Sequence, residues 1–249
     1  MKKIFIDPGH GGMSVGASYK GRREQDDCLR LALAVKSILS SQEGVEVMLS
    51  REDNSNPSIE KRCRDANEWG ADYFLSIHRN AFAPNAAAGV EAWVYSKVET
   101  GGETYTQAEN IVDGICTAVP FTNRKVKKGA PSYADFGVNR LTKMSSCLLE
   151  AGFIDSDTDN ALFDGYFADI ALAIAKALMK NAGLDYKEKI LVGDADGDGR
   201  ITAADARLIL RAAVGLESIS AEVGDLDGDG RITASDARDA LRLATEKEG

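Results

Sequence analysis

A fifteen-residue segment occurs twice near the C-terminal end of the chain, and this repeat restricts the possible folds more than any other feature. Residues 193–207 read GDADGDGRITAADAR, and residues 224–238 read GDLDGDGRITASDAR. Such a close match at a spacing of 31 residues indicates a duplicated structural unit. The sequence therefore predicts a small repeated domain at residues 190–249, separate from a larger one at residues 1–185.

Each copy has the pattern D-x-D-x-D-G-x-I-x-x-x-D, with acidic side chains at positions 1, 3, 5 and 12. Together with the carbonyl of position 7, these carboxylates form the oxygen shell that calcium prefers, and glycine at position 6 permits the sharp turn. An Asp- and Gly-rich turn without an ion is the alternative, but its carboxylates would repel one another. We therefore expect two calcium ions, and folding that is coupled to metal. The predicted calcium ligands are Asp194, Asp196, Asp198, Arg200 and Asp205 in the first loop and Asp225, Asp227, Asp229, Arg231 and Asp236 in the second.

Composition and charge exclude several classes of protein. The content of 44% hydrophobic and 28% charged residues is usual for a globular chain. No apolar run approaches the roughly 20 residues that a membrane span needs, so we expect no membrane partner. The net charge of −9 lies mostly in residues 190–249, and neither part is basic, so we expect no nucleic-acid partner. The start, MKKIFIDPGHGG, lacks the hydrophobic core of a signal peptide.

Residues 1–185 alternate short apolar runs with segments of helical periodicity, which predicts an α/β domain with a mixed sheet flanked by helices. The expected strands are residues 2–6, 45–49, 73–77, 90–95 and 146–149. The expected helices are residues 24–39, 59–69, 107–118 and 166–182, and Gly70 is expected to end the second of them. A short polar link, residues 183–191, leads to the calcium loops.

The chain has only two histidines, His10 and His78, and each follows a short apolar strand. In an open α/β sheet the C-terminal ends of strands line the ligand crevice. Glu150 ends a third strand, and Glu24 opens the first helix after a glycine-rich stretch. Two imidazoles and one carboxylate, with a fourth position open, are the usual ligands of a hydrolytic zinc ion, and a second glutamate nearby can act as general base.

Spacing alone leaves alternatives open. A histidine at a strand end is often a hydrogen-bonded structural residue. Glu60 and Glu91 compete with the other two glutamates for the same roles.

Several motifs carry a resemblance to a known family: DPGHGG (7–12), LSRED (49–53), SIHRNAF (76–82), GVEAWVY (89–95) and LLEAGFIDS (148–156). In order and spacing, residues 1 to about 182 resemble the zinc-dependent N-acetylmuramoyl-L-alanine amidases of the Amidase_3 type, which have a phosphorylase/hydrolase-like fold. The resemblance implies one zinc ion bound by His10, Glu24 and His78, with Glu150 as the catalytic glutamate. Two departures are Arg79, where a small residue is common, and Ser50, where the family often has Thr.

The same resemblance implies an activity. Enzymes of this type hydrolyse the amide between the lactyl group of N-acetylmuramic acid and L-alanine in peptidoglycan. Zinc polarises the carbonyl and activates water, while the glutamate takes up the proton and passes it to the departing amine. Asn80 is expected to point into this site and contact substrate, with an Asx-type turn as the alternative, whereas Arg51 and Arg62 are expected to be structural.

Residues 192–248 resemble a type I dockerin, a duplicated all-α calcium loop–helix module that binds cohesin domains on scaffold proteins. This implies a cohesin as a partner in addition to the peptidoglycan substrate. The alternatives are that the calcium module binds the wall itself or only stabilises the enzyme. By the same resemblance, the residues that select a cohesin are Ala203, Ala204 and Arg211 in the first copy and Ala234, Ser235 and Arg242 in the second.

Two other functions are compatible with the motifs. One is a zinc peptidase or carboxypeptidase that acts on cell-wall peptides. The other is a scaffold-attached module that binds the wall without cutting it. In each case the expected place of action is the bacterial cell wall, reached either as a secreted enzyme or as a phage-type lysin.

Overall fold

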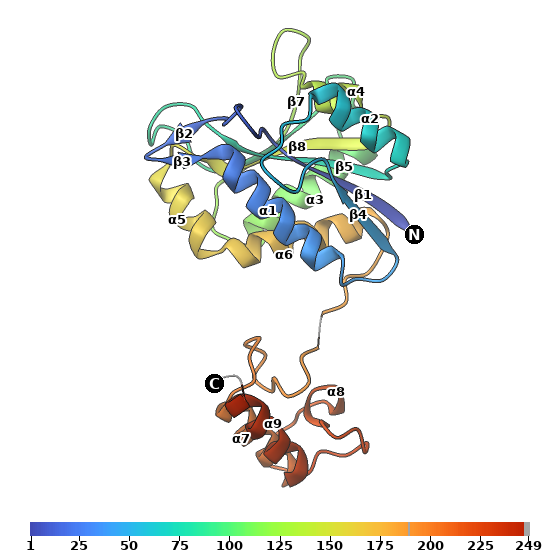
Figure 1. Cartoon of the computed structure of the whole chain (residues 1–249), viewed down its shortest axis with the longest axis vertical. Coiled ribbons are helices and arrows are strands. Elements are labelled where there is room, and N and C mark those ends of the chain that lie inside the picture. Colours follow the sequence, from blue (N-terminus) through green and yellow to red (C-terminus); the bar gives the residue numbers. More distant parts are fainter. Residues whose placement is uncertain (189, 247–249) are drawn as a thin grey trace. The chain divides into compact units, whose positions relative to one another are not determined.

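The computed structural model describes residues 1–188 and 190–246 of the chain (Figure 1). The chain divides into two compact units, Met1–Tyr186 and Lys187–Gly249. Within the described ranges, no helix combines the length and apolar character that crossing a bilayer requires.

A six-stranded mixed sheet forms the centre of the first unit, in the order β4-β1-β5-β8-β6-β7. Strands β4, β1, β5 and β8 run parallel, whereas β6 is antiparallel to β8 and parallel to β7. A separate two-stranded ribbon pairs β2 with β3. The strands are β1 (Lys2–Pro8), β2 (Ser18–Tyr19), β3 (Arg22–Arg23), β4 (Val45–Leu49), β5 (Tyr73–Asn80), β6 (Val90–Val94), β7 (Asn123–Lys128) and β8 (Ser145–Phe153).

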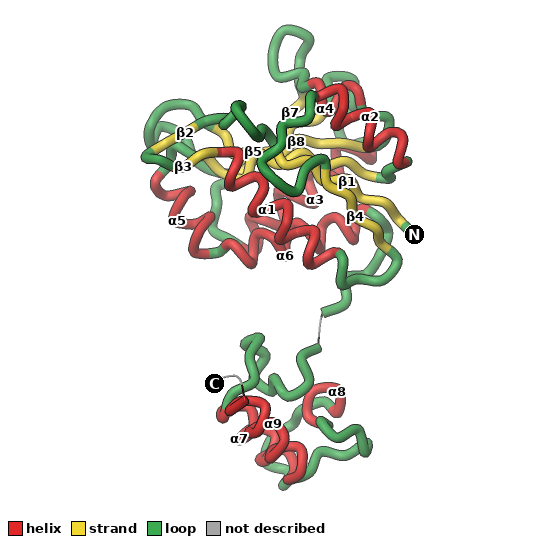
Figure 2. Tube along the Cα trace, viewed as in Figure 1, coloured by secondary structure: helices red, strands yellow, loops and turns green. Residues whose placement is uncertain are grey.

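Helices cover both faces of the sheet (Figure 2). The larger core lies under α1 (Glu24–Leu39), α3 (Glu103–Ala118) and α6 (Phe167–Asn181), whose apolar stripes pack against Ile6 and Ile77 of the sheet. The smaller core lies under α2 (Ile59–Trp69) and α4 (Gly137–Leu141), where Phe5 and Phe74 stack with ring centroids 5.5 Å apart. Helix α5 (Asp157–Gly165) follows β8. The predicted mixed sheet flanked by helices is confirmed.

Three strands, β1, β5 and β8, extend further than the sequence predicted, and in two of them this changes the place of a candidate residue. Because β5 continues to Asn80 and β8 to Phe153, His78 lies inside a strand instead of after it, and Glu150 lies inside a strand instead of at its end. They are ladder partners in neighbouring strands. Polar residues that face the cleft interrupt the apolar runs, so a rule based on apolar runs stops these strands too early.

Elements with few buried apolar residues were missing from the prediction. Strand β7, with the sequence NRKVKK, lies at the sheet edge, and Val126 is its one buried residue. Helix α5 was also not predicted, although Ser156 caps it by accepting the N–H of Asp159. Helix α2 was predicted with its correct bounds, and Gly70 ends it in the left-handed conformation, with φ of 72°.

The second unit is a small all-α domain. Helices α7 (Ala203–Ala213) and α9 (Ala234–Glu246) each follow one of the repeated loops, and the short α8 (Ala221–Gly224) precedes the second loop. Its core contains Ile201, Ile209 and Ala240. A helix after each loop agrees with the predicted duplicated architecture.

Candidate active site and calcium loops

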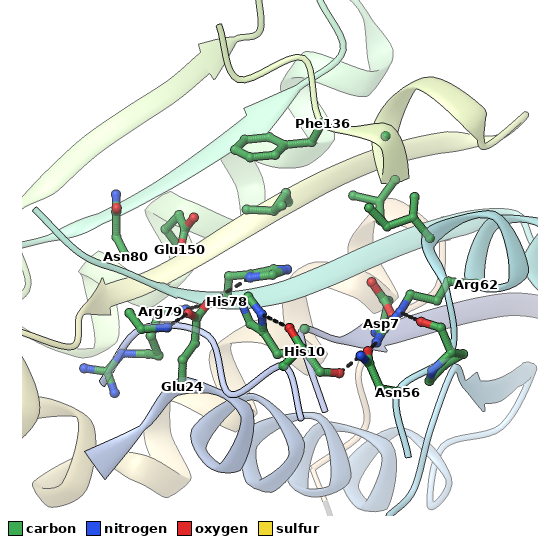
Figure 3. A pocket seen from close by; sticks show the side chains of 18 of the residues that line it. Asp7, His10, Glu24, Asn56, Arg62, His78, Arg79, Asn80, Phe136 and Glu150 are labelled. Atoms are coloured by element: carbon green, nitrogen blue, oxygen red, sulfur yellow. Dashed lines mark hydrogen bonds and ion pairs between the residues drawn. The ribbon is translucent and has the colours of Figure 1, made fainter. Parts of the chain in front are cut away.

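Three candidate zinc ligands from three different elements meet at one end of the sheet (Figure 3). His10 follows β1, Glu24 begins α1 and His78 lies in β5. The Oε1 atom of Glu24 is 3.0 Å from His10 Nε2 and 2.9 Å from His78 Nδ1. One donor atom of each residue lies within 4.8 Å of the other two. Two imidazoles and a carboxylate at this separation suit a zinc ion with an open coordination position.

Two glycines allow the ligands to approach this closely. A Cβ atom on Gly9 would collide with the imidazole ring of His78. A Cβ atom on Gly16 would lie 2.5 Å from Glu24 Oε2 and 2.7 Å from His10 Cδ2. The glycine-rich stretch that the sequence showed therefore has a steric function, because side chains at these two positions would occupy the space of the ligands.

The carboxylate of Glu24 is buried and fixed from both sides. Its Oε2 accepts the N–H of Ala17 at 2.8 Å, and its Oε1 accepts the N–H of Arg79 at 3.2 Å. Burial raises the pKa of Glu24, but the hydrogen bonds from His10 and His78 outweigh burial and hold the pKa below its usual value. The group is therefore ionised at neutral pH, as a metal ligand must be.

A fourth carboxylate, Glu150, faces the same cleft (Figure 3). It lies on β8 between its ladder partners His78 on β5 and Glu91 on β6. Its Oε2 atom is buried and accepts no hydrogen bond from the residues that the structure describes. Burial raises the pKa of Glu150 well above its usual value, and the charges of Glu24 and Glu91 raise it further. A carboxylate with a buried, unsatisfied oxygen is uncommon, and its raised pKa suits a group that exchanges a proton.

These groups line a cleft of about 620 Å³. One part of its wall is polar and contains the four residues described above. Another part is apolar and contains Ile59, Phe136, Val138 and Leu148. A cleft with an apolar wall and a few convergent polar groups is the usual form of a ligand site.

The other predicted candidates have different surroundings. Asn80 borders the cleft, but its Oδ1 accepts the N–H of Ala81 at 2.8 Å and its Nδ2 donates to Glu91 Oε1 at 3.1 Å. Its contact with substrate stays a prediction. Neither Glu60, which is exposed on α2, nor Glu91 belongs to the three-donor group.

Both repeated loops bring acidic side chains together, although not with the same members. Donor atoms of Asp194, Asp196 and Asp205 lie within 4.8 Å of one another in the first loop. In the second loop the corresponding group is Asp225, Asp227 and Asp229. A backbone hydrogen bond lowers the pKa of Asp196, but burial and the neighbouring carboxylates outweigh it and raise the pKa. A divalent cation would relieve this repulsion.

The carboxylates at position 12 connect each loop to the helix that follows it. Asp205 is fully buried, and its Oδ1 accepts the N–H groups of Ala195 and Asp196 at 2.9 and 3.1 Å. Its Oδ2 accepts the N–H of Thr202 at 2.8 Å, which completes a capping box at the start of α7. Asp236 repeats this arrangement in the second copy. The duplicated sequence thus produces a duplicated hydrogen-bond network.

Comparison with known families identifies both units. A family model described as N-acetylmuramoyl-L-alanine amidase, Amidase_3, matches residues 4–180. The chain belongs to this family. A second model, the dockerin type I domain, matches residues 192–242. Both resemblances noted in the sequence are thereby confirmed.

Relatives of this Amidase_3 chain include enzymes of bacteria and of a phage. It is 38% identical over 218 residues to the N-acetylmuramoyl-L-alanine amidase CwlM of Bacillus licheniformis, a match that covers 83% of this chain and 82% of that protein. It is 41% identical over 160 residues to the sporulation-specific N-acetylmuramoyl-L-alanine amidase of Bacillus subtilis (strain 168), covering 64% of this chain and 59% of that one. The endolysin of Bacillus phage SPP1 is 32% identical over 188 residues, with coverages of 75% and 68%.

Solved structures show the same Amidase_3 fold. The catalytic domain of CwlV, an N-acetylmuramoyl-L-alanine amidase from Bacillus (Paenibacillus) polymyxa var. colistinus, superposes with a TM-score of 0.67 at 28% identity. The match covers 74% of this chain and all of that one. An N-acetylmuramoyl-L-alanine amidase from Clostridium difficile 630 gives a TM-score of 0.66 at 30% identity, covering 72% and 95%.

In the sequence of this amidase domain, Arg79 is a departure from the family pattern, but the sequence does not indicate what the side chain does. The guanidinium group is buried, donates to Asp27 Oδ2 at 2.6 Å and to Asn160 Oδ1 at 2.7 Å, and lies 4.1 Å from the ring centroid of Phe163. The pKa of Arg79 is lowered to about 10, because burial lowers it more than the negative charge of Asp27 raises it. Alternation along β5 was the available signal, because His78 and Arg79 must point to opposite faces of the sheet.

Proposed function

We propose that this chain hydrolyses the amide between the lactyl group of N-acetylmuramic acid and L-alanine in peptidoglycan. In this proposal His10, Glu24 and His78 bind one zinc ion, and Glu150 is the general base. The observation that carries the proposal is the meeting of three donor groups beside a carboxylate that has a buried, unsatisfied oxygen. Family membership supports the amidase activity.

Each residue of the site has a distinct part in the proposed reaction. Zinc, when bound, supplies a Lewis acid and lowers the pKa of a bound water toward about 7. Glu24, held ionised by its two imidazole partners, keeps the ligand geometry fixed. Glu150 accepts the proton of the attacking water and later returns a proton to the departing amine of L-alanine. The apolar wall of the cleft limits the access of further water to the reacting groups.

The test is to measure the zinc content of the full-length chain and to identify the new amine after incubation with purified peptidoglycan. We expect one zinc ion per chain and a newly exposed amine on L-alanine. A new amine on a later residue of the stem peptide would support a zinc peptidase or carboxypeptidase instead. Zinc binding without any cleavage would support a module that only binds the wall.

We further propose that residues 190–249 bind two calcium ions and attach the enzyme, at residues 1–185, to a cohesin on a scaffold protein at the cell wall. The match to a dockerin type I domain and the two acidic loops support this proposal. The predicted cohesin-selecting residues Ala203, Ala204, Ala234 and Ser235 lie in the first turns of α7 and α9, and Arg211 and Arg242 lie further along the same helices. Calorimetric titration of the full-length chain with calcium should give two sites. Removal of residues 190–249 should weaken attachment without loss of amide hydrolysis.

A further inference from the structure

Two buried arginines bind the backbone carbonyls of the loop that presents His10. Arg62 donates from Nη1 to the carbonyl of Pro8 and from Nη2 to the carbonyl of His10, each at 2.7 Å. Arg51 donates from Nε to the carbonyl of Pro8 at 3.1 Å and from Nη2 to the carbonyl of Gly9 at 2.7 Å. Both arginines are only 4% exposed. Three successive carbonyls, those of residues 8–10, are therefore held by two guanidinium groups, and we call this arrangement the arginine clamp.

The clamp acts on a segment that has an unfavourable backbone conformation. His10 has φ of 59°, in the left-handed region that residues other than glycine rarely adopt. Such a conformation persists only where the surroundings determine it. The hydrogen bond from Arg62 to the His10 carbonyl stabilises this conformation, because rotation of the backbone away from it would break the hydrogen bond.

Arg51 also connects the backbone around two of the proposed zinc ligands. Its Nη2 donates to the carbonyl of Gly9 and, at 2.9 Å, to the carbonyl of Gln25 in the first turn of α1. Gly9 precedes His10, and Gln25 follows Glu24. A single guanidinium nitrogen therefore fixes the separation of the two segments that carry these ligands.

The clamp is itself anchored to the sheet. Arg62 Nη1 donates to Asp7 Oδ1 at 2.6 Å, and Asp7 also accepts hydrogen bonds from Ser50 and Ser76. Since Asp7 lies in β1 and Ser76 in β5, the carboxylate connects the clamp to two central strands. The position of His10 is thus determined by the rigid centre of the fold.

Arg62 lines the cleft, yet it has no donor left for a substrate. An arginine has five N–H donors, and all five of Arg62 are used: its Nε donates to Pro57, its Nη1 to Asp7 and Pro8, and its Nη2 to His10 and Asn56. A guanidinium that is buried and saturated in this way is suited to holding the chain and not to binding a ligand.

We propose that Arg51 and Arg62 are positioning residues that set the zinc affinity of the site by fixing the backbone of residues 8–10. This inference rests on the proposed function, because it concerns the same metal ligands. Groups that orient metal ligands typically contribute 10- to 100-fold to metal affinity.

The test compares the zinc affinity of the full-length wild-type chain with that of Arg62→Lys and Arg51→Lys, by competition with a zinc chelator of known affinity. Lysine keeps the charge but cannot bind two carbonyls with one planar group. We expect the zinc dissociation constant to rise about 10- to 100-fold in each variant. The matched control is Arg124→Lys, because Arg124 also donates to a buried carboxylate, Glu91 Oε2, at 2.6 Å and touches no carbonyl of residues 8–10. The control should retain the wild-type zinc affinity.

A second measurement separates positioning from substrate binding. With zinc in excess, the Lys variants should recover the wild-type kcat and KM, because only metal occupancy was lost. Unchanged zinc affinity in folded Arg62→Lys and Arg51→Lys would overturn the inference, and so would a raised KM that excess zinc does not restore. If thermal unfolding shows that Arg62→Lys does not fold, the zinc affinity of Arg51→Lys alone tests the inference. A wild-type chain that binds no zinc would contradict the proposed function itself, whereas equal affinities in all chains would contradict only the clamp.

Discussion

At the scale of one residue, Glu150 is the proposed general base, and its surroundings lower the stability of the fold. Its Oε2 atom lies buried without a hydrogen-bond partner among the described residues, and two other carboxylates, Glu24 and Glu91, raise its pKa after burial itself. Leaving a buried acceptor unsatisfied costs about 1–3 kcal/mol. Such a cost is usual where a group must remain available for reaction.

Replacing this carboxylate should therefore separate activity from stability. In Glu150→Ala, and in the isosteric Glu150→Gln, we expect turnover to fall by about 10²- to 10⁴-fold, the usual contribution of a general base. Zinc should stay bound, because no ligand is changed. The thermal unfolding midpoint of Glu150→Gln should equal or exceed that of the wild type. Peptidoglycan cleavage at the wild-type rate in either variant would refute the assigned role.

Glu91 is the opposite case, a buried carboxylate whose oxygens are fully used. Its Oε2 accepts from Arg124 and Lys127, each at 2.6 Å, and its Oε1 accepts from Trp93 at 3.0 Å. Burial raises the pKa of Glu91, but these hydrogen bonds outweigh burial and lower it. Because the folded-state pKa lies below the unfolded value, the stability that Glu91 provides is complete above the unfolded pKa and is lost as the pH falls through the folded pKa.

The Glu91→Gln variant should show this dependence directly. At pH 7 we expect its free energy of unfolding to lie about 2–3 kcal/mol below that of the wild type. This loss is smaller than the loss expected for a fully buried ion pair, because both cations are about one-third exposed. The difference from the wild type should shrink as the pH falls below about 4. Urea unfolding at a series of pH values measures it, with Glu68→Gln on the exposed surface of α2 as the control. A difference that stays constant down to pH 3 would contradict the assignment.

At the scale of elements, the glycine-rich segment between β1 and α1 brings two proposed zinc ligands together. Gly16 and Gly21 lie in this segment and have similar φ angles of 72° and 82°. Their surroundings differ, because a Cβ atom on Gly16 would meet Glu24 and His10, whereas one on Gly21 would meet no described atom within 4 Å. Substitutions at these two positions therefore distinguish the effect of backbone strain from the effect of crowding at the proposed metal site.

We expect Gly16→Ala to weaken zinc binding by at least about 10-fold, since the methyl group must displace a ligand. Gly21→Ala should lower stability by about 1 kcal/mol, the cost of a positive φ angle for alanine, and should leave zinc affinity unchanged. Chelator competition and thermal unfolding of both variants test this pair. Equal zinc affinities in the two variants would show that Gly16 does not shape the site.

At the scale of the whole molecule, the two units are expected to depend on different metals. Each proposed calcium loop gathers carboxylates near the start of a helix, and the small core around Ile209 gives that unit little stability of its own. The first unit has a much larger core that surrounds a six-stranded sheet. Its stability should not require calcium.

Removing calcium should therefore unfold the second unit alone. With zinc maintained, a calcium-selective chelator should reduce the helical circular dichroism of α7 and α9 and leave the thermal transition of the first unit in place. Readdition of calcium should restore the signal, because metal binding and folding are coupled. A chain without residues 190–249 should show no such change. A helical signal that is insensitive to calcium in the full-length chain would argue against calcium sites.

The sequence by itself determined the features that depend on nearby residues. The calcium loops were visible because all proposed ligands of one ion lie within twelve residues, where the local backbone brings them together. The bounds of α1, α2 and β4 followed from periodicity and, for α2, from the left-handed Gly70. Family motifs also indicated His10, Glu24, His78 and Glu150. That indication came from a resemblance to known sequences and not from where these residues lie in space.

Only the tertiary structure decided which distant groups touch. His78 and Glu24 are 54 residues apart in the chain, and their contact depends on the packing of α1 against the sheet. The unsatisfied oxygen of Glu150 and the saturated donors of Arg62 likewise depend on burial, which composition and spacing do not contain. The physical reason is that short-range geometry is set by the bonded chain, whereas the pKa of a carboxylate and the position of a ligand loop are set by atoms that only folding brings near.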